Sequence, residues 1–325
     1  MRDAAKGRKQ TLARVGRAVA GVIFAFILLV GIIEAVLRFV LGLGNPVLIA
    51  PDAACAYILK PDQDVRRFFA QTRTNHYGMR SEEVPAVRHA GALRLMFVGD
   101  SITYGTSRVD QQHLFTEVVH RELPSIVHRP VEVLNASASA WAPDNELAYI
   151  RSRGIFQSDI VLLVLNDGDL TQPRSTIAGV GGDLLQKRPI TAIGELFTRY
   201  IGPRISNLLE KSDAGDKIAA NSDDVMRNNL ADLDSIQKLV RLQGAKLLIV
   251  YIPFRRDIPD LSKASGSILK EWSDAHQVGM FDLTSAEAPY TAKEITLDNG
   301  IHLNAKGHGV IARALEQSWL EVAGN

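Results

Sequence analysis

Two polar motifs that lie far apart in the chain could together carry out nucleophilic catalysis. Ser101 stands in the run 99–103 (Gly-Asp-Ser-Ile-Thr), directly after an apolar stretch, and His302 stands just before a C-terminal amphipathic stretch. A serine hydroxyl is a weak nucleophile until a base takes its proton, and imidazole is the side chain suited to this near neutral pH. Gly-Asp-Ser alone is also a common turn, so both motifs are needed. They predict Ser101 as nucleophile and His302, rather than His308 inside the last helix, as base.

The elements around these motifs indicate an α/β fold with a parallel sheet. Short apolar runs, typical of buried parallel strands, occupy residues 93–98, 131–134, 160–165, 246–252 and 280–282. Amphipathic stretches that fit intervening helices occupy residues 117–122, 145–153, 223–242, 267–276 and 305–323. Ligands bind at the carboxyl ends of the strands in such sheets. The Ser101 turn and the His302 loop are therefore expected to meet at that edge.

The motifs resemble those of the SGNH/GDSL hydrolase family. The family's first block matches residues 99–103, its last block matches 302–308, and the resemblance covers 93–325. Residues 74–80 are similar to a Thr-Asn-x-x-Gly-x-Arg stretch of membrane-anchored bacterial members. The resemblance implies a three-layer α/β/α, flavodoxin-like domain with a five-stranded parallel sheet. It also implies a serine esterase. The remaining histidines lack metal-ligand spacing and nothing resembles a phosphate loop, so no cofactor and no metal is predicted.

The same resemblance implies an oxyanion hole built from the Ser101 backbone, the Ala140 backbone and the Asn166 side chain. The second block matches residues 135–140, and Ala140 stands where the family usually has glycine. Alanine keeps the N–H group but is restricted if the position requires a positive φ. The third block matches 164–167, where the glycine is replaced and the amide of Asn166 is kept.

The acid that should support His302 is the least regular match. The family places aspartate three residues before its histidine, and that position holds Asn299, with Asp298 one residue earlier. A carboxylate stabilises the imidazolium and fixes its tautomer, so a one-residue shift that brings Asp298 to the ring is the favoured interpretation. A serine–histidine dyad supported by Asn299, and loss of catalysis, stay open as alternatives.

The N-terminal segment indicates a membrane anchor. Residues 18–43 are apolar except for Glu34 and Arg38 near the far end, a length that suits one transmembrane helix. A four-residue offset lets these two side chains pair. The tail at 1–17 is basic, so the positive-inside rule predicts a cytoplasmic N-terminus and an extracytoplasmic domain, periplasmic in a Gram-negative cell. A cleaved signal peptide is the alternative.

This interpretation divides the chain into a basic cytoplasmic tail, a transmembrane helix, an extracytoplasmic lead-in that packs on the domain, and the hydrolase domain. Their bounds are 1–17, 18–43, 44–92 and 93–325, with an insertion at 168–221 that could cover the site.

The composition narrows the function further. The chain has 37 lysine and arginine residues and 36 aspartate and glutamate residues. Its net charge is therefore close to zero and does not indicate nucleic acid as a partner.

The prediction is an extracytoplasmic serine esterase that cleaves small acyl esters, with O-acetyl groups on cell-surface polysaccharide as the favoured substrate. A polysaccharide O-acetyltransferase that uses the same serine, and a catalytically inactive envelope binding or scaffold protein, are the alternatives.

Overall fold

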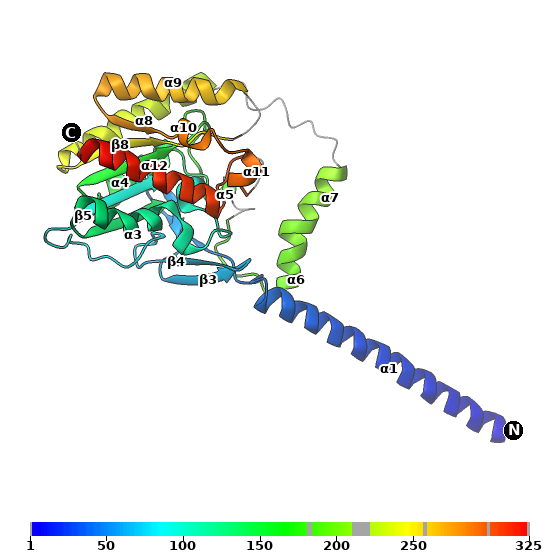
Figure 1. The fold of residues 1–325 in the computed structure, drawn as a ribbon. Coiled ribbons are helices and arrows are strands. Elements are labelled where there is room, and N and C mark those ends of the chain that lie inside the picture. Colours follow the sequence, from blue (N-terminus) through cyan, green and yellow to red (C-terminus); the bar gives the residue numbers. More distant parts are fainter. Residues whose placement is uncertain (1, 181–183, 210–221, 256–258, 298–299, 324–325) are drawn as a thin grey trace.

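A five-stranded sheet forms the centre of the domain. The computed structural model describes residues 2–180, 184–209, 222–255, 259–297 and 300–323 (Figure 1). The sheet strands are β5 (Leu93–Gly99), β6 (Val131–Ser137), β7 (Ile160–Leu165), β8 (Lys246–Tyr251) and β9 (Gly279–Asp282). They pair in parallel in the order β6-β5-β7-β8-β9. This is the flavodoxin-like order, so the predicted fold class is confirmed.

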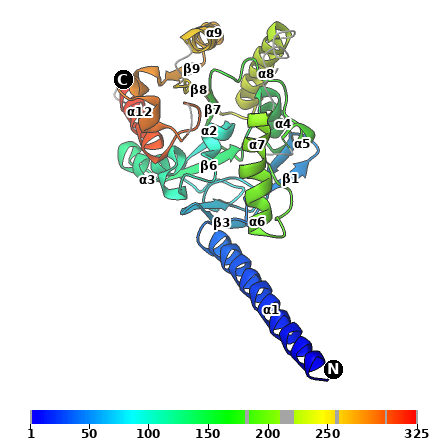
Figure 2. The ribbon, with the colours of Figure 1, turned by 90° about the vertical axis from the view of Figure 1, so that its right-hand side faces the viewer.

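Helices cover both faces of the sheet and make it the middle layer of three (Figure 2). One face is covered by α3 (Phe115–Val127) and α12 (Ala305–Ala323), whose apolar side chains share one core cluster. The other face is covered by α4 (Pro143–Arg153), α8 (Ser222–Leu242) and α9 (Pro259–His276). Each predicted helix is present, although α3 and α9 extend beyond the residues that the pattern indicated.

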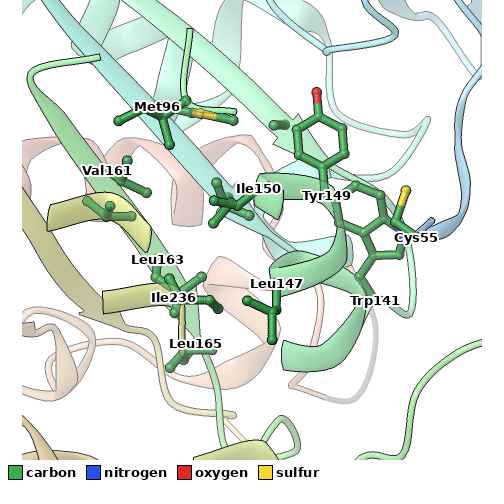
Figure 3. Packing of buried hydrophobic residues seen from close by; sticks show 14 of the residues in the cluster. Cys55, Met96, Trp141, Leu147, Tyr149, Ile150, Val161, Leu163, Leu165 and Ile236 are labelled. Carbon is green, nitrogen blue, oxygen red and sulfur yellow. The ribbon is translucent and has the colours of Figure 1, made fainter. Parts of the chain in front are cut away.

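Side chains of the central strands alternate between the two core layers. Met96 of β5 and Leu163 of β7 face the layer that contains Leu147 and Ile150 of α4 (Figure 3). Phe97 of β5 faces the opposite layer. All seven residues of β5 are buried. A strand buried on both faces reads as a nearly continuous apolar run, which is why these strands could be located in the sequence; the exception in β5 is Arg94, which pairs with Glu132 of β6 at 2.5 Å.

The lead-in before the sheet folds into two antiparallel hairpins that the sequence did not indicate. They pair β1 (Ile49–Asp52) with β2 (Ala56–Leu59) and β3 (Gln63–Arg67) with β4 (Ala70–Thr74). Tyr57 is fully buried in the core layer beside α4, and its hydroxyl donates to the Ser139 carbonyl at 2.7 Å. The lead-in therefore packs on the domain, as predicted.

The N-terminal helix α1 (Arg2–Phe39) extends away from the domain (Figure 1). Its segment Arg14–Phe39 is long and apolar enough to span a membrane. The predicted end at residue 43 is wrong, because the helix stops at Phe39 and the chain turns through Gly42 and Gly44 with positive φ. A Cβ at Gly42 would lie 2.2 Å from a backbone oxygen of the β3 strand, so only glycine fits this turn.

Within its described residues, the predicted insertion after β7 contains four short helical elements, and other short helices lie in connecting loops. The insertion holds α5 (Ile177–Val180), α6 (Ala192–Glu195), η2 (Leu196–Ile201) and α7 (Gly202–Leu209). The loops hold α2 (Ser101–Tyr104), η1 (Gln111–His113), α10 (Thr284–Glu287) and α11 (Ala292–Ile295).

The end of α1 is joined to the insertion by four charged side chains, which we call the anchor junction: Glu34, Arg38, Arg67 and Glu195. Glu34 accepts hydrogen bonds from the first two backbone N–H groups of α6 at 2.8 and 3.0 Å, and it pairs with Arg38 at 2.7 Å. Arg67 pairs with Glu195 at 2.7 Å with both side chains buried. The predicted Glu34–Arg38 pair is confirmed, and it also caps a helix.

Candidate active site

Ser101 is placed by the tight turn at the carboxyl end of β5. The strand leads through Gly99 into α2, whose first residue is Ser101, and the Asp100 side chain caps this helix by accepting from the Ile102 N–H at 2.8 Å. A Cβ at Gly99 would lie 2.3 Å from the Thr103 hydroxyl oxygen, so a larger residue would push α2 away. Gly99 and Asp100 thus form the turn and the helix start, and Ser101 presents its hydroxyl at the edge of the sheet.

His302 comes within hydrogen-bonding distance of this serine. Its Nε2 lies 3.0 Å from the Ser101 Oγ. The backbone carbonyl of His302 accepts from Leu297 at 2.7 Å, and the Asn304 side chain caps α12 by accepting from the Gly307 N–H at 3.0 Å. The histidine loop is therefore held on both sides, and the two side chains that the motifs single out face each other.

His308 has a different place in the fold. It is fully buried, its ring stacks on Phe115 at 5.6 Å, and its Nδ1 accepts from the Phe115 N–H at 3.3 Å. Burial lowers the pKa of His308 to about 3, helped by the positive charges of Arg80 and His113. This histidine is a neutral packing residue.

The predicted acid lies outside the described residues. Asp298 and the alternative Asn299 are the two residues between the described ranges 259–297 and 300–323. Among the described residues, a carboxyl that the sequence did not single out lies near the serine. The Oδ2 of Asp100 lies 3.4 Å from the Ser101 Oγ.

Asn166 follows β7 and lines the same cavity as Ser101 and His302. Its amide nitrogen donates to the Asp100 Oδ2 at 3.1 Å, and its side-chain oxygen accepts from the Gly168 N–H at 2.8 Å. These two contacts fix the orientation of the amide plane. An amide nitrogen carries two hydrogens, so one N–H remains for a developing oxyanion while the other binds Asp100.

Ala140 adopts the positive φ that glycine would favour, at +62°. Its carbonyl accepts from Gln172 at 2.8 Å and from the Ser175 hydroxyl, so two insertion side chains hold this conformation. Left-handed backbone costs alanine roughly 1 kcal/mol relative to glycine. Stored strain of this kind is typical of functional loops. Ala140 also lines the cavity with Ser101.

Three buried carboxyls lie at the site without a cationic partner among the described residues. Asp100, Glu146 and Asp169 are each buried, and burial raises the pKa of all three. Asp169 accepts from the Asn166 backbone N–H at 2.7 Å, whereas neither oxygen of Glu146 has a hydrogen-bond partner. Attraction to His302 opposes the rise for Asp100. Negative charge at Asp100 would stabilise the imidazolium that forms when His302 takes the serine proton.

A cavity of about 570 Å³ opens above these residues. Its floor is formed by the candidate catalytic residues Ser101, Ala140, Asn166 and His302, and we call this part of the sheet edge, with the buried carboxyls beside it, the catalytic edge. Its other walls come from the insertion and the lead-in, whose lining residues include Gln172, Val180, Leu184, Arg199, Tyr200 and Arg67. The insertion therefore lines the site, in agreement with the expectation that it could cover it. No sequence motif marks these wall residues, so none of them could be predicted.

One group of possible metal ligands lies away from this cavity. Glu82, Glu117 and His120 offer atoms within 4.8 Å of one another. Gln111 donates to Glu117 at 2.8 Å, and burial, reinforced by the Glu82 charge, raises the pKa of Glu117 to about 7. The sequence positions did not predict this grouping, and none of its three residues lines the cavity of Ser101.

Comparison with known proteins gives matches only among solved structures. No protein-family model and no curated protein matches this chain. An α/β hydrolase, LAE5, from the metagenome of Lake Arreo in Spain is 15% identical, with a TM-score of 0.47, over 72% of this chain and 98% of that one.

Two further solved structures match nearly as large a share of this chain. The acetylxylan esterase Axe2 from Geobacillus stearothermophilus is 12% identical, with a TM-score of 0.45, over 72% of this chain and 95% of its own. A lipolytic protein of the G-D-S-L family from Veillonella parvula is 12% identical, with a TM-score of 0.44, over 69% and 97%. At these identities and TM-scores, the function of this chain has to be argued from its own side chains.

Proposed function

We propose that this chain is a membrane-anchored serine esterase that cleaves small acyl esters outside the cytoplasm. The 3.0 Å approach of the His302 Nε2 to the Ser101 Oγ carries the proposal, because it joins a nucleophile and a base at the ligand-binding edge of a parallel sheet. The cavity above the pair has room for a small acyl ester together with part of its alcohol.

The reaction follows from the roles of these groups. His302 takes the proton from Ser101 as its Oγ attacks the ester carbonyl, and the carbonyl oxygen becomes an oxyanion. The N–H groups of Ser101 and Ala140 and the Asn166 amide stabilise that oxyanion. His302 then protonates the leaving alcohol, and water, activated by the same histidine, releases the acid from the acyl-enzyme. Asp298 supports the imidazolium in this scheme, and the charge of Asp100 assists it.

The retained anchor is supported by the way α1 joins the domain. Apolar side chains from Val15 to Ile33 are exposed, as expected of a helix that contacts lipid rather than protein. The last turns belong to the domain, since Glu34 caps α6 and Leu37 is buried with Leu43. Cleavage of a signal peptide would remove these contacts. The basic tail before the helix supports a cytoplasmic N-terminus.

A glycan ester fits the cavity better than a purely apolar one. The walls present polar side chains such as Gln172, Ser107 and Arg199 beside apolar ones. Such a lining suits a hydroxyl-rich alcohol that carries a small acyl group. O-acetyl groups on extracytoplasmic polysaccharide are therefore the proposed natural substrate.

Replacement of the serine tests this function. The full chain in detergent should hydrolyse p-nitrophenyl acetate, and Ser101→Ala should lower kcat by roughly 10⁴-fold or more. Ser107→Ala is the matched control, because this serine lines the same cavity but has no bond to His302. Equal rates for wild type and Ser101→Ala would refute the proposal. If acylated sugar forms faster than free acid when an oligosaccharide is added, the same serine serves a transferase instead.

A further inference from the structure

Exposed apolar side chains gather where α1 meets the domain. The described residues beyond Val36 include nine exposed large hydrophobic side chains, and three of them, Val87, Leu242 and Leu320, lie elsewhere on the domain. The other six belong to the end of α1, the β3–β4 turn and the insertion: Phe39, Val40, Phe69, Ile190, Phe197 and Ile205. Apolar side chains concentrated in one region mark an interaction surface, whereas scattered ones do not.

The β3–β4 turn supplies Phe69 at a cost in backbone strain. Phe68 and Phe69 both have positive φ, at +48° and +66°, where hairpin turns prefer asparagine and glycine. Phe69 is nevertheless 67% exposed, whereas Phe68 packs against Tyr200. The Phe68 N–H donates to the Leu41 carbonyl at 3.0 Å, which ties the turn to the segment after α1. Neither the fold of the hairpin nor its core needs an exposed phenylalanine here.

The insertion supplies Ile190, Phe197 and Ile205, and its direction suits a surface that lies across α1. In both views α6 begins beside the end of α1 (Figures 1 and 2), and Figure 1 shows that α7 then runs across the direction of α1 rather than along it. The Glu34 cap on α6 and the buried Arg67–Glu195 pair fix this arrangement. A segment beside the end of a membrane span, and crosswise to it, lies along the membrane surface.

The charges around these apolar side chains are complementary to an anionic bilayer. Between residues 184 and 205 the exposed charged side chains are Lys187, Arg188 and Arg204, and the acidic Glu195 is buried. Arg66 and Arg108 are exposed near the β3–β4 turn, and Arg108 lies 5.8 Å above the Phe68 ring. Apolar side chains flanked by basic ones are the pattern of segments that bind the headgroup region.

We propose that Phe69, Ile190, Phe197 and Ile205, which we call the docking surface, rest on the anionic outer face of the bilayer that α1 spans. This inference rests on the proposed function for its membrane anchor. The η2 helix that carries Phe197 also places Arg199 and Tyr200 in the wall of the catalytic cavity. The cavity of Ser101 therefore lies beside the membrane surface, and its substrates are acylated glycans that are themselves attached to lipids of that leaflet.

Fluorescence quenching by brominated lipid tests the contact directly. The full chain carrying Phe197→Trp is placed in nanodiscs of phosphatidylcholine and phosphatidylglycerol, with and without bromine on the acyl chains. Leu242→Trp is the matched control, because Leu242 is 73% exposed at the end of α8 and far from α1. The three native tryptophans give both variants the same background. Bromine should reduce the added emission of Phe197→Trp about twofold or more and leave that of Leu242→Trp unchanged.

Equal quenching of the two variants, or none in either, would overturn the docking surface. Activity gives a second readout. Phe197→Asp combined with Ile205→Asp should lower hydrolysis of an acyl ester embedded in the nanodisc about tenfold and leave p-nitrophenyl acetate hydrolysis unchanged. An equal loss on both substrates would contradict the proposal. If wild type cleaves neither ester, the proposed esterase function fails, while the quenching result still decides whether the surface contacts lipid.

Discussion

The anchor junction and the catalytic edge both bury ionisable side chains, but the two regions differ in whether these side chains have partners of opposite charge. At the junction each carboxylate has a cation, since Glu195 pairs with Arg67 and Glu34 pairs with Arg38. At the catalytic edge, burial raises the pKa of Asp100, Glu146 and Asp169, and none has a cationic partner among the described residues.

The ion pairs of the anchor junction fix the relative position of the segments that they join, because a misplaced partner leaves a buried charge unsatisfied. Unpaired carboxyls with a raised pKa, such as those at the catalytic edge, are typical of functional sites. The junction therefore fixes α1 against the domain, and the edge holds polar groups of the kind that the proposed chemistry needs.

The largest expected effect on stability is at the junction. Arg67→Met removes the closer of the two cations that pair with the buried Glu195 carboxylate, leaves only Arg199 at 3.5 Å, and should lower the free energy of unfolding by about 3 kcal/mol. Lys270→Met is the control, because its pair with Asp274 is exposed and should contribute less than about 1 kcal/mol. Urea unfolding of the full chain in detergent, followed by circular dichroism, measures both. If both variants lose a similarly small free energy of unfolding, the buried pair of the anchor junction does not stabilise the fold more than an exposed pair does.

A substitution at the catalytic edge should lower kcat rather than the free energy of unfolding. Asn166→Ala removes one oxyanion donor and should lower kcat roughly 10²–10³-fold, or about 2.7–4 kcal/mol of transition-state stabilisation. Asn75→Ala is the control, because Asn75 is equally buried and accepts from the Tyr77 and Met79 N–H groups at 3.0 Å, away from the cavity. Its kcat should change less than about threefold. A full rate for Asn166→Ala would remove this amide from the mechanism.

The smallest effect is a pH dependence of stability at the catalytic edge. The pKa of Glu146 is raised by burial and by the Asp100 charge, so the folded state holds a proton that the unfolded chain releases above about pH 4.5. Stability is full below that pH and declines as pH rises. Glu146→Gln should therefore lose less melting temperature than wild type between about pH 5 and about pH 8. Asp100 and Asp169 share the direction, so part of the decline remains.

Glu271→Gln is the control for this pH series, because Glu271 is exposed. Its melting curve should follow that of wild type at every pH. If Glu146→Gln also follows wild type, the buried carboxyls do not carry this pH dependence.

Those parts of the fold that depend on local patterns could be predicted from the sequence. The five strands are apolar runs, and Ser101, Asn166 and His302 stand where such strands or the last helix begin or end, so their meeting follows from the topology. The β3 strand was missed because its sequence, Gln63–Arg67, is mostly polar and covers little core.

The rest of the site depends on contacts between distant segments. Glu34 meets α6 across more than 150 residues, and Arg199 reaches the cavity from an insertion without a regular pattern. No spacing in the sequence indicates such contacts. Ala140 is intermediate, since its motif position raised the question of a positive φ, and the structure shows one because Gln172 and Ser175 hold its carbonyl.

The most direct test of the account is covalent labelling of the serine. A fluorophosphonate probe reacts only with an activated serine, and mass spectrometry of the intact protein and its peptides locates the label. Wild type should carry one label on Ser101, and His302→Ala should lose the labelling, whereas His308→Ala, if folded, should keep it. Absence of label from folded wild-type protein, or undiminished labelling of His302→Ala, would contradict the claim that His302 activates Ser101 across the 3.0 Å contact.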